Sequence, residues 1–213
     1  MRIVTRWWWI RHAPVTEDDG RIYGQTDLSC NVSDTPKFKA LAQALPRDAV
    51  WLTSNLCRTR ETAHAIRAHG VPVAREFVLP DLAEQHFGEW QGQVRTEILA
   101  KYAPPSGFWI APADHVPPGG ESFSAMMKRV TAAIDRVTSE HSGSHIVAVA
   151  HGGTIRAALG HALGLPPPLA LSFAVDNCSL TRVDHVVAGG DVHWHIVTVN
   201  DNLGRGVTFS ARL

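Results

Sequence analysis

Apolar residues fall along the chain in two kinds of pattern. Continuous apolar runs predict buried strands at residues 7–10, 49–54 and 145–150, and residues 71–79 predict a further strand. Apolar positions spaced three and four apart predict helices at 37–44, 57–69, 93–102 and 122–141, with one more helix after residue 153. Two later runs, near 178–184 and 192–199, are joined by a Gly-Gly turn and predict a hairpin. Strands that alternate with helices predict an α/β fold, a three-layer sandwich in which helices flank a mostly parallel sheet.

Two segments lack these patterns and are expected to be loops. Residues 15–35 are rich in Asp, Gly and Ser, and residues 103–119 are rich in proline. We expect the second loop to form a flap over a pocket, with Phe108, Trp109 or His115 near the organic part of a ligand. The alternative is a surface loop that is packed by its own aromatic side chains.

Composition narrows the class of protein. The chain has 213 residues, of which 20 are basic and 20 are acidic, without a basic stripe, and this argues against nucleic acid as a partner. No stretch approaches the roughly 20 apolar residues that span a bilayer, and the N-terminus lacks the uninterrupted apolar core of a signal peptide. These features predict a cytoplasmic protein that binds no membrane. No repeat, low-complexity tract or linker interrupts the chain, which predicts one domain over residues 1–213.

The cysteines indicate neither a metal centre nor a disulfide framework. Cys30, Cys57 and Cys178 are odd in number and far apart, which favours free thiols in a reducing compartment. None of them is followed by arginine at the spacing C-x₅-R that cysteine phosphatases need. No carboxylate cluster is present to hold a metal, so we expect neither a metal nor a cofactor.

Polar clusters follow the predicted strands at the points where the strands end. They are Arg11-His12-Ala13, Ser54-Asn55-Leu56-Cys57-Arg58, Glu84-Gln85-His86-Phe87-Gly88-Glu89-Trp90 and His151-Gly152-Gly153. In open α/β sheets the binding site lies beyond the carboxyl ends of the strands. If the strands are neighbours, these clusters therefore converge on one crevice.

The residue types in these clusters match the chemistry of a phosphate dianion. Guanidinium groups such as that of Arg11 offer paired donors to phosphate oxygens, and Gly152 at a helix start lets backbone N–H groups approach an anion. The neutral imidazole of His12 can attack phosphorus if its other ring nitrogen is held by an acceptor. Arg11 and Arg58 should lower the pKa of His12, and Glu84 is the candidate donor of a proton to the leaving oxygen.

Other readings of the same residues stay open at this point. Arg60 is as good a candidate as Arg58 for the second guanidinium. Glu84 could cap the segment behind it, and His151 could be a core histidine with satisfied hydrogen bonds.

Taken together, the motifs resemble those of the histidine phosphatase superfamily, which has the phosphoglycerate-mutase-like fold. The matching elements are Arg11-His12-Ala13, the S-x-L-x-R-T-x-x-T-A element at 54–63, the L-x-E-x-x-F-G-x-W-x-G element at 82–92, Gly-Gly-Glu-Ser at 119–122 and V-x-H-G-G-x-I-R at 149–156. The resemblance favours Arg58 over Arg60. It implies that His12 becomes a phosphohistidine, that His151 and both arginines bind the phosphoryl group, and that Glu84 is the proton donor.

The loop after the nucleophile departs in part from the family pattern. Val15 and Asp18 stand where many members carry a hydroxyl and an asparagine, and the sequence at 28–31 differs from the usual Pro-Leu-Thr. The preceding Gly-Gln-Thr-Asp does fit, and on this basis Gln25 and Thr26, together with Gly152, are assigned to substrate binding.

The sequence therefore predicts a metal-independent phosphatase of the histidine acid type, which hydrolyses a small phosphomonoester. A phosphoglycerate-type mutase is the first alternative, and the altered loop argues against it. A non-catalytic phosphate-binding module on the same fold is the second. Binding alone does not need a proton donor, so the presence of Glu84 argues against such a module.

Overall fold

The computed structural model describes residues 1–73 and 75–203, which form a six-stranded mixed sheet with the order β3-β2-β4-β1-β5-β6. The strands are β1 (Arg2–Arg11), β2 (Ala49–Thr53), β3 (Arg75–Val78), β4 (His145–Ala150), β5 (Leu180–Ala188) and β6 (Asp191–Asp201). The four strands from β3 to β1 are parallel, and β5 and β6 are antiparallel to their neighbours. The predicted α/β fold with a mostly parallel sheet and a C-terminal hairpin is confirmed.

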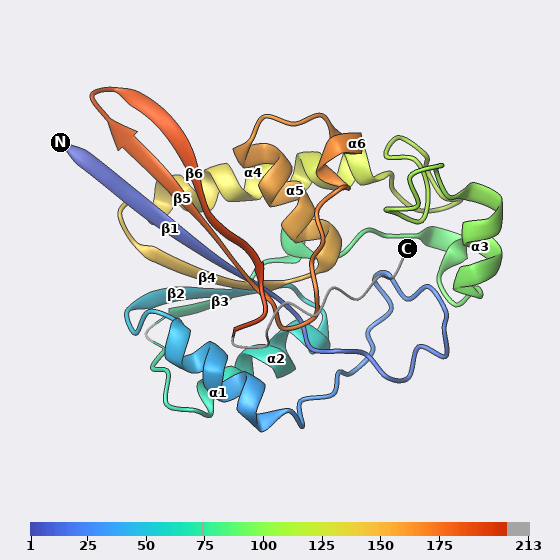
Figure 1. Ribbon diagram of the computed structural model, residues 1–213, viewed down its shortest axis with the longest axis horizontal. Coiled ribbons are helices and arrows are strands. Elements are labelled where there is room, and N and C mark those ends of the chain that lie inside the picture. Colours follow the sequence, from blue (N-terminus) through green and yellow to red (C-terminus); the bar gives the residue numbers. More distant parts are fainter. Residues whose placement is uncertain (74, 204–213) are drawn as a thin grey trace.

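Helices cover both faces of the sheet. They are α1 (Thr35–Ala44), α2 (Cys57–Arg67), α3 (Arg95–Tyr102), α4 (Phe123–Glu140), α5 (Gly152–Ala162) and α6 (Pro167–Ala170), with 3₁₀ turns at Pro80–Leu82 and Gly88–Trp90. Figure 1 shows α1 and α2 on one face and α4 and α5 on the other, which gives three layers. None of the helices in the described ranges is long and apolar enough to cross a membrane.

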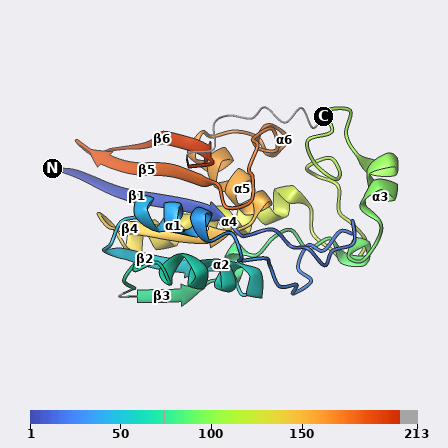
Figure 2. The ribbon, with the colours of Figure 1, turned by 60° about the horizontal axis from the view of Figure 1, so that its bottom comes forward.

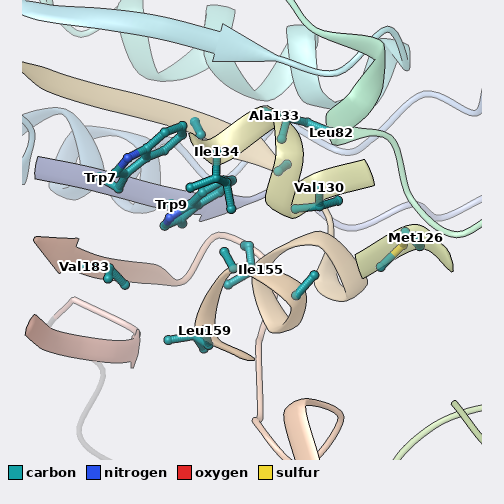
Figure 3. Packing of buried hydrophobic residues seen from close by; sticks show 14 of the residues in the cluster. Trp7, Trp9, Leu82, Met126, Val130, Ala133, Ile134, Ile155, Leu159 and Val183 are labelled. Carbon is teal, nitrogen blue, oxygen red and sulfur yellow. The ribbon is translucent and has the colours of Figure 1, made fainter. Parts of the chain in front are cut away.

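Alternate residues of the strands supply the two cores. On one face, Trp7 and Trp9 of β1 stack with ring centroids 4.8 Å apart and pack with Val130 and Ile134 of α4, as Figure 3 shows. On the other face, the buried Trp51 of β2 belongs to the core beneath α1 and α2. Successive residues of a strand point to opposite faces of the sheet, and helices cover both faces. The central strands are therefore apolar at successive positions.

Two of the strands that differ from their predicted extents are β1 and β3. The strand predicted at 7–10 begins at Arg2, because β1 pairs with β5 along almost its whole length. The strand predicted at 71–79 contains only Arg75–Val78, which is exposed and pairs with β2 alone. Residue 74 of that prediction, and residues 204–213 of the predicted domain, lie outside the described residues.

The parallel strands direct their carboxyl ends to one end of the molecule. β1 runs beside β4, which runs beside β2, so the segments that follow these three strands lie close together. Figure 2 shows α3 and the connection from α3 to α4 beyond these strand ends. All four predicted polar clusters lie at this end.

Candidate active site

His12 is held directly after β1 by its own backbone. Its N–H donates to the carbonyl of Ala150 at the end of β4 (2.9 Å), and its ring Nδ1 lies 2.7 Å from the carbonyl oxygen of Ala13. A carbonyl oxygen only accepts, so Nδ1 carries the proton and Nε2 keeps its lone pair. The ring is therefore set in the tautomer that a nucleophilic Nε2 needs.

The surroundings keep His12 unprotonated. Burial is the largest cause that lowers its pKa well below the usual value, and the positive charges of Arg11 and Arg58 lower it further. The hydrogen bond to Ala13 acts in the opposite direction. The sequence predicted the direction of this shift from the arginines, and the structure adds desolvation as its main cause.

His151 lies beside His12, at the start of α5. The two ring centroids are 5.2 Å apart. Nε2 of His151 is hydrogen-bonded to Oγ of Ser54 (2.8 Å), whereas its Nδ1 is buried and has no partner in the described part of the chain. The pKa of His151 is also well below its usual value, through burial first and then the charge of Arg58. A core histidine with satisfied hydrogen bonds does not describe this side chain.

Terminal guanidinium nitrogens of Arg11 and Arg58 donate hydrogen bonds to backbone carbonyls. Arg11 Nη1 donates to Val175 (2.6 Å), and the two terminal nitrogens of Arg58 donate to Thr26 (2.9 Å) and Gly24 (2.6 Å). The Nε atoms of both arginines are buried and lack a partner among residues 1–73 and 75–203. Buried polar groups are normally paired, so these donors are available to an anion.

The structure distinguishes Arg58 from Arg60. The side chain of Arg58 is fully buried at the site, and its guanidinium carbon lies 5.0 Å from the ring centre of Tyr23. Arg60 is exposed and lines a separate groove of about 830 Å³ along α1, α2 and β3. None of the predicted site residues lines that groove.

Glu84 reaches across to the first turn of α5. Its Oε2 accepts from the amide of Gly153 (3.1 Å), and its Oε1 accepts from the amide of Gln85 (3.0 Å). The carboxyl group is buried and lines a pocket together with Arg11 and Gly152. Glu84 therefore does more than cap its own segment.

The other carboxylates of this region are placed differently. Glu121 is ion-paired with Arg129 (2.6 Å) and also accepts from the amide of His86. Glu89 is exposed, and Oδ1 of Asp27 accepts from the amide of Cys57 (2.6 Å) at the start of α2. Among the described residues, Glu84 is the only carboxylate that lines the pocket.

The residues assigned to substrate binding are near the site, and two of them hold other site residues. The side-chain amide of Gln25 donates to the carbonyl of Glu84 (2.8 Å), and the carbonyl of Thr26 accepts from Arg58. Gly152 lies so close to Arg11 that a Cβ there would be 3.5 Å from its Nε. Contact of these three residues with a substrate stays a prediction.

The predicted flap places two of its three aromatic side chains at the pocket. Phe108 and Trp109 line it, and Trp109 Nε1 donates to Gln85 Oε1 (2.8 Å). His115 instead stacks on Trp90, with ring centroids 5.2 Å apart. The segment is therefore partly a pocket wall and partly packed by its own rings.

Sequence reasoning missed several neighbours of these residues. Asn177 donates from its side chain to the carbonyl of His12 (2.8 Å), although no strand end or motif marks it. Tyr23, Arg21 and Arg95 line the pocket. Arg21 and Tyr23 stand just before the Gly-Gln-Thr-Asp loop, and this proximity was the one signal that could have indicated them.

No group of three or more histidine, cysteine, aspartate or glutamate side chains in the described ranges could hold a metal ion. The arrangement offers two neutral imidazoles, two guanidinium groups with unpaired donors and one buried carboxyl group. These groups suit transfer of a phosphoryl group to and from a histidine.

Known proteins with similar structures share this fold. One is a mycobacterial hydrolase, "Mycobacterial hydrolase 2", with a TM-score of 0.81, 24% identity and coverage of 96% of this chain and 94% of that chain. Another is mycobacterial glucosyl-3-phosphoglycerate phosphatase in complex with VO3, with a TM-score of 0.74, 26% identity and coverage of 92% and 98%.

Similar sequences include both phosphatases and probable mutases. A metal-independent phosphoserine phosphatase of Arabidopsis thaliana is 32% identical over 70% of this chain, and the match spans 64% of that relative's length. A probable phosphoglycerate mutase of Serratia proteamaculans is 30% identical over 78% of this chain and 77% of its own. The adenosylcobalamin/alpha-ribazole phosphatase of Escherichia coli is 26% identical over 84% of this chain and 89% of its own. The sequence pattern of the histidine phosphatase superfamily (branch 1) matches residues 7–202, and the chain belongs to that family.

Proposed function

We propose that this protein is a phosphatase that hydrolyses a small phosphomonoester through a phosphorylated His12, without a metal ion. The observation that carries the proposal is the hydrogen bond from His12 Nδ1 to the carbonyl of Ala13. It leaves Nε2 as a nucleophile in a site that also contains Nε of Arg11, Nε of Arg58 and Nδ1 of His151, and these three buried nitrogens have no hydrogen-bond partner among the described residues. The wider family, whose members are phosphatases and mutases, supports the reaction class.

In the first step, Nε2 of His12 attacks phosphorus and the bond from phosphorus to the ester oxygen breaks. Glu84 gives a proton to the departing alkoxide, which leaves as the alcohol. The negative oxygens of the transferring group are stabilised by the guanidinium groups of Arg11 and Arg58 and by His151.

In the second step, water attacks the phosphohistidine. Glu84, now a carboxylate, takes a proton from that water as the bond between nitrogen and phosphorus breaks. Inorganic phosphate leaves, and His12 returns to its neutral form with the proton still on Nδ1. Glu84 again carries its proton and His12 is free of the phosphoryl group, so the enzyme is ready for the next cycle.

Hydrolysis is favoured over mutase activity by the loop after the nucleophile. A mutase must retain the phosphorylated acid for a second transfer, and this loop carries Val15 and Asp18 where many members have a hydroxyl and an asparagine. The similarity to named phosphatases of Arabidopsis thaliana and Escherichia coli supports the same choice.

The test is a steady-state assay of phosphate release from p-nitrophenyl phosphate and from a panel of alkyl phosphates, with and without a chelator. We expect turnover that survives the chelator and that is abolished in His12→Gln. Loss of all turnover in the chelator, restored by Mg²⁺, would contradict a metal-independent mechanism. Phosphoryl transfer between two positions of a phosphoglycerate, without release of phosphate, would favour the mutase.

A further inference from the structure

The pocket beside Glu84 contains more positive charge than a phosphoryl group requires. Its lining includes four arginines and one carboxylate, namely Arg11, Arg21, Arg95, Arg156 and Glu84. Arg11 belongs with Arg58 to the phosphoryl site, which leaves the other three pocket arginines without an assigned role. None of these three forms an ion pair with any residue in the described part of the chain.

Arg21 and Arg95 are held next to each other by the backbone. Arg21 pairs with Val94 in a short antiparallel bridge, and the amide of Arg95 donates to the carbonyl of Gly20 (2.9 Å). Nη1 of Arg21 donates to the carbonyl of Gly92 (2.7 Å). The two arginines therefore lie on adjacent segments, and neither forms an ion pair with a carboxylate among residues 1–73 and 75–203.

Arg156 lines the same pocket as this pair and lies close to Arg11. Its Nε donates to the carbonyl of Phe173 (2.8 Å), and its guanidinium carbon lies 4.9 Å from the ring centre of Trp109. A Cβ at Gly152 would lie 3.2 Å from Nη1 of Arg156 and 3.5 Å from Nε of Arg11. Burial, followed by repulsion from Arg11, lowers the pKa of Arg156 to about 10, so it remains charged at neutral pH.

We infer that the substrate carries a second anionic group on its organic part, which Arg21, Arg95 and Arg156 bind. This inference rests on the proposed phosphatase function. Planar guanidinium donors match a carboxylate or a second phosphate. Trp109 and the 54% exposed Phe108 supply an apolar wall for the carbons between the two anionic groups. A charged pocket that excludes neutral analogues is also a usual means of specificity.

The experiment compares esters of matched size. Pentyl phosphate has one anionic group, 4-carboxybutyl phosphate adds a carboxylate, and 4-phosphonobutyl phosphate adds a phosphonate. We expect kcat/KM to be about 10- to 100-fold higher for one or both of the doubly anionic esters, which is the size of one or two charge-assisted hydrogen bonds. The better of the two identifies the second group as a carboxylate or a phosphate.

Three variants then test the assigned arginines. Arg21→Gln, Arg95→Gln and Arg156→Gln should each reduce the ratio of kcat/KM between doubly and singly anionic esters by about 10-fold, mainly through KM. Arg2→Gln removes an exposed arginine at the opposite end of β1 and should leave the ratio unchanged. Arg21 and Arg95 are exposed, so their variants remain informative if Arg156→Gln fails to fold.

The outcomes separate this inference from the proposed function. A ratio near one in the wild type, or a ratio that none of the three variants alters, would overturn the second anionic site while hydrolysis still occurs. If none of the three esters and not even p-nitrophenyl phosphate is hydrolysed, the phosphatase proposal itself fails, and the inference falls with it.

Discussion

The backbone amide of Gly153 donates to Oε2 of Glu84 at 3.1 Å, which joins the first turn of α5 to the candidate proton donor. The same approach leaves no room for a side chain at position 153, because a Cβ there would overlap Oε1 of Glu84. The glycine therefore determines where the carboxyl group lies.

Gly153→Ala should displace the Glu84 carboxyl group from the pocket with little loss of stability. The atoms in the way are the carboxyl end of Glu84 and Cε of Met126 at 3.0 Å, both at the far ends of flexible side chains. We expect kcat for alkyl phosphates to fall by about 10²-fold or more, as for loss of a general acid. Kinetics with alkyl phosphates and a melting curve check this; a large drop in melting temperature with unchanged kcat would contradict it.

Glu84→Gln keeps the size of the side chain but removes the proton. The loss should fall on kcat, by about 10²–10⁴-fold for alkyl phosphates. It should be far smaller for p-nitrophenyl phosphate, because nitrophenolate leaves without protonation. Equal losses for both kinds of ester would show that Glu84 is not the acid.

Arg129 is expected to position Glu84 through hydrogen bonds to the backbone of the segment that carries it. It donates to the carbonyls of Asp81, Ala83 and Glu84 and pairs with Glu121. Arg129→Met should lower the free energy of unfolding by about 1–3 kcal/mol. It should also lower kcat more for alkyl than for nitrophenyl phosphates, an effect that a purely structural role would not produce.

Arg136→Met is the matched control on the same helix. Arg136 pairs with Asp81 at 2.9 Å but is 48% exposed, so the change should cost less than about 1 kcal/mol. The ratio of kcat between alkyl and nitrophenyl phosphates should be the same as in the wild type. If Arg129→Met behaves in the same way, Arg129 does not position the acid.

The buried imidazoles of His12 and His151 predict how stability depends on pH. Folding lowers the pKa of both below the value of about 6.5 in an unfolded chain. As the pH falls below that value, the unfolded chain takes up protons that the folded chain does not, so the free energy of unfolding decreases.

Urea unfolding of the wild type and of His12→Asn at pH 7.5 and pH 5.5 measures this effect. The difference in unfolding free energy, wild type minus variant, should become smaller at the lower pH, because only the wild type has the His12 contribution to lose. A difference that is the same at both pH values would contradict the depressed pKa of His12.

The sequence was enough to predict the features that local patterns control. Apolar runs located the strands β1, β2 and β4, and the rule for parallel strands placed Arg11, Arg58 and His151 at one end of the sheet. The hairpin of β5 and β6 followed from its Gly-Gly turn.

The missed features depend on contacts between distant segments. The length of β1 is determined by its pairing with β5, and the pairing of Arg21 with Val94 joins two loops that carry no strand pattern. The unpaired nitrogen of His151 likewise depends on which atoms its neighbours, such as Ser54, present to it. Such relationships arise only when the chain is folded.

Trapping of the phosphoenzyme tests the role of His12 most directly. The protein is mixed with a ³²P-labelled phosphomonoester, quenched with denaturant at alkaline pH within the first turnover, and analysed by peptide mapping. The account predicts a phosphoryl group on His12 that is stable to base and released by acid, and that is absent from His12→Gln. Label on another residue, or equal labelling of His12→Gln, would contradict it.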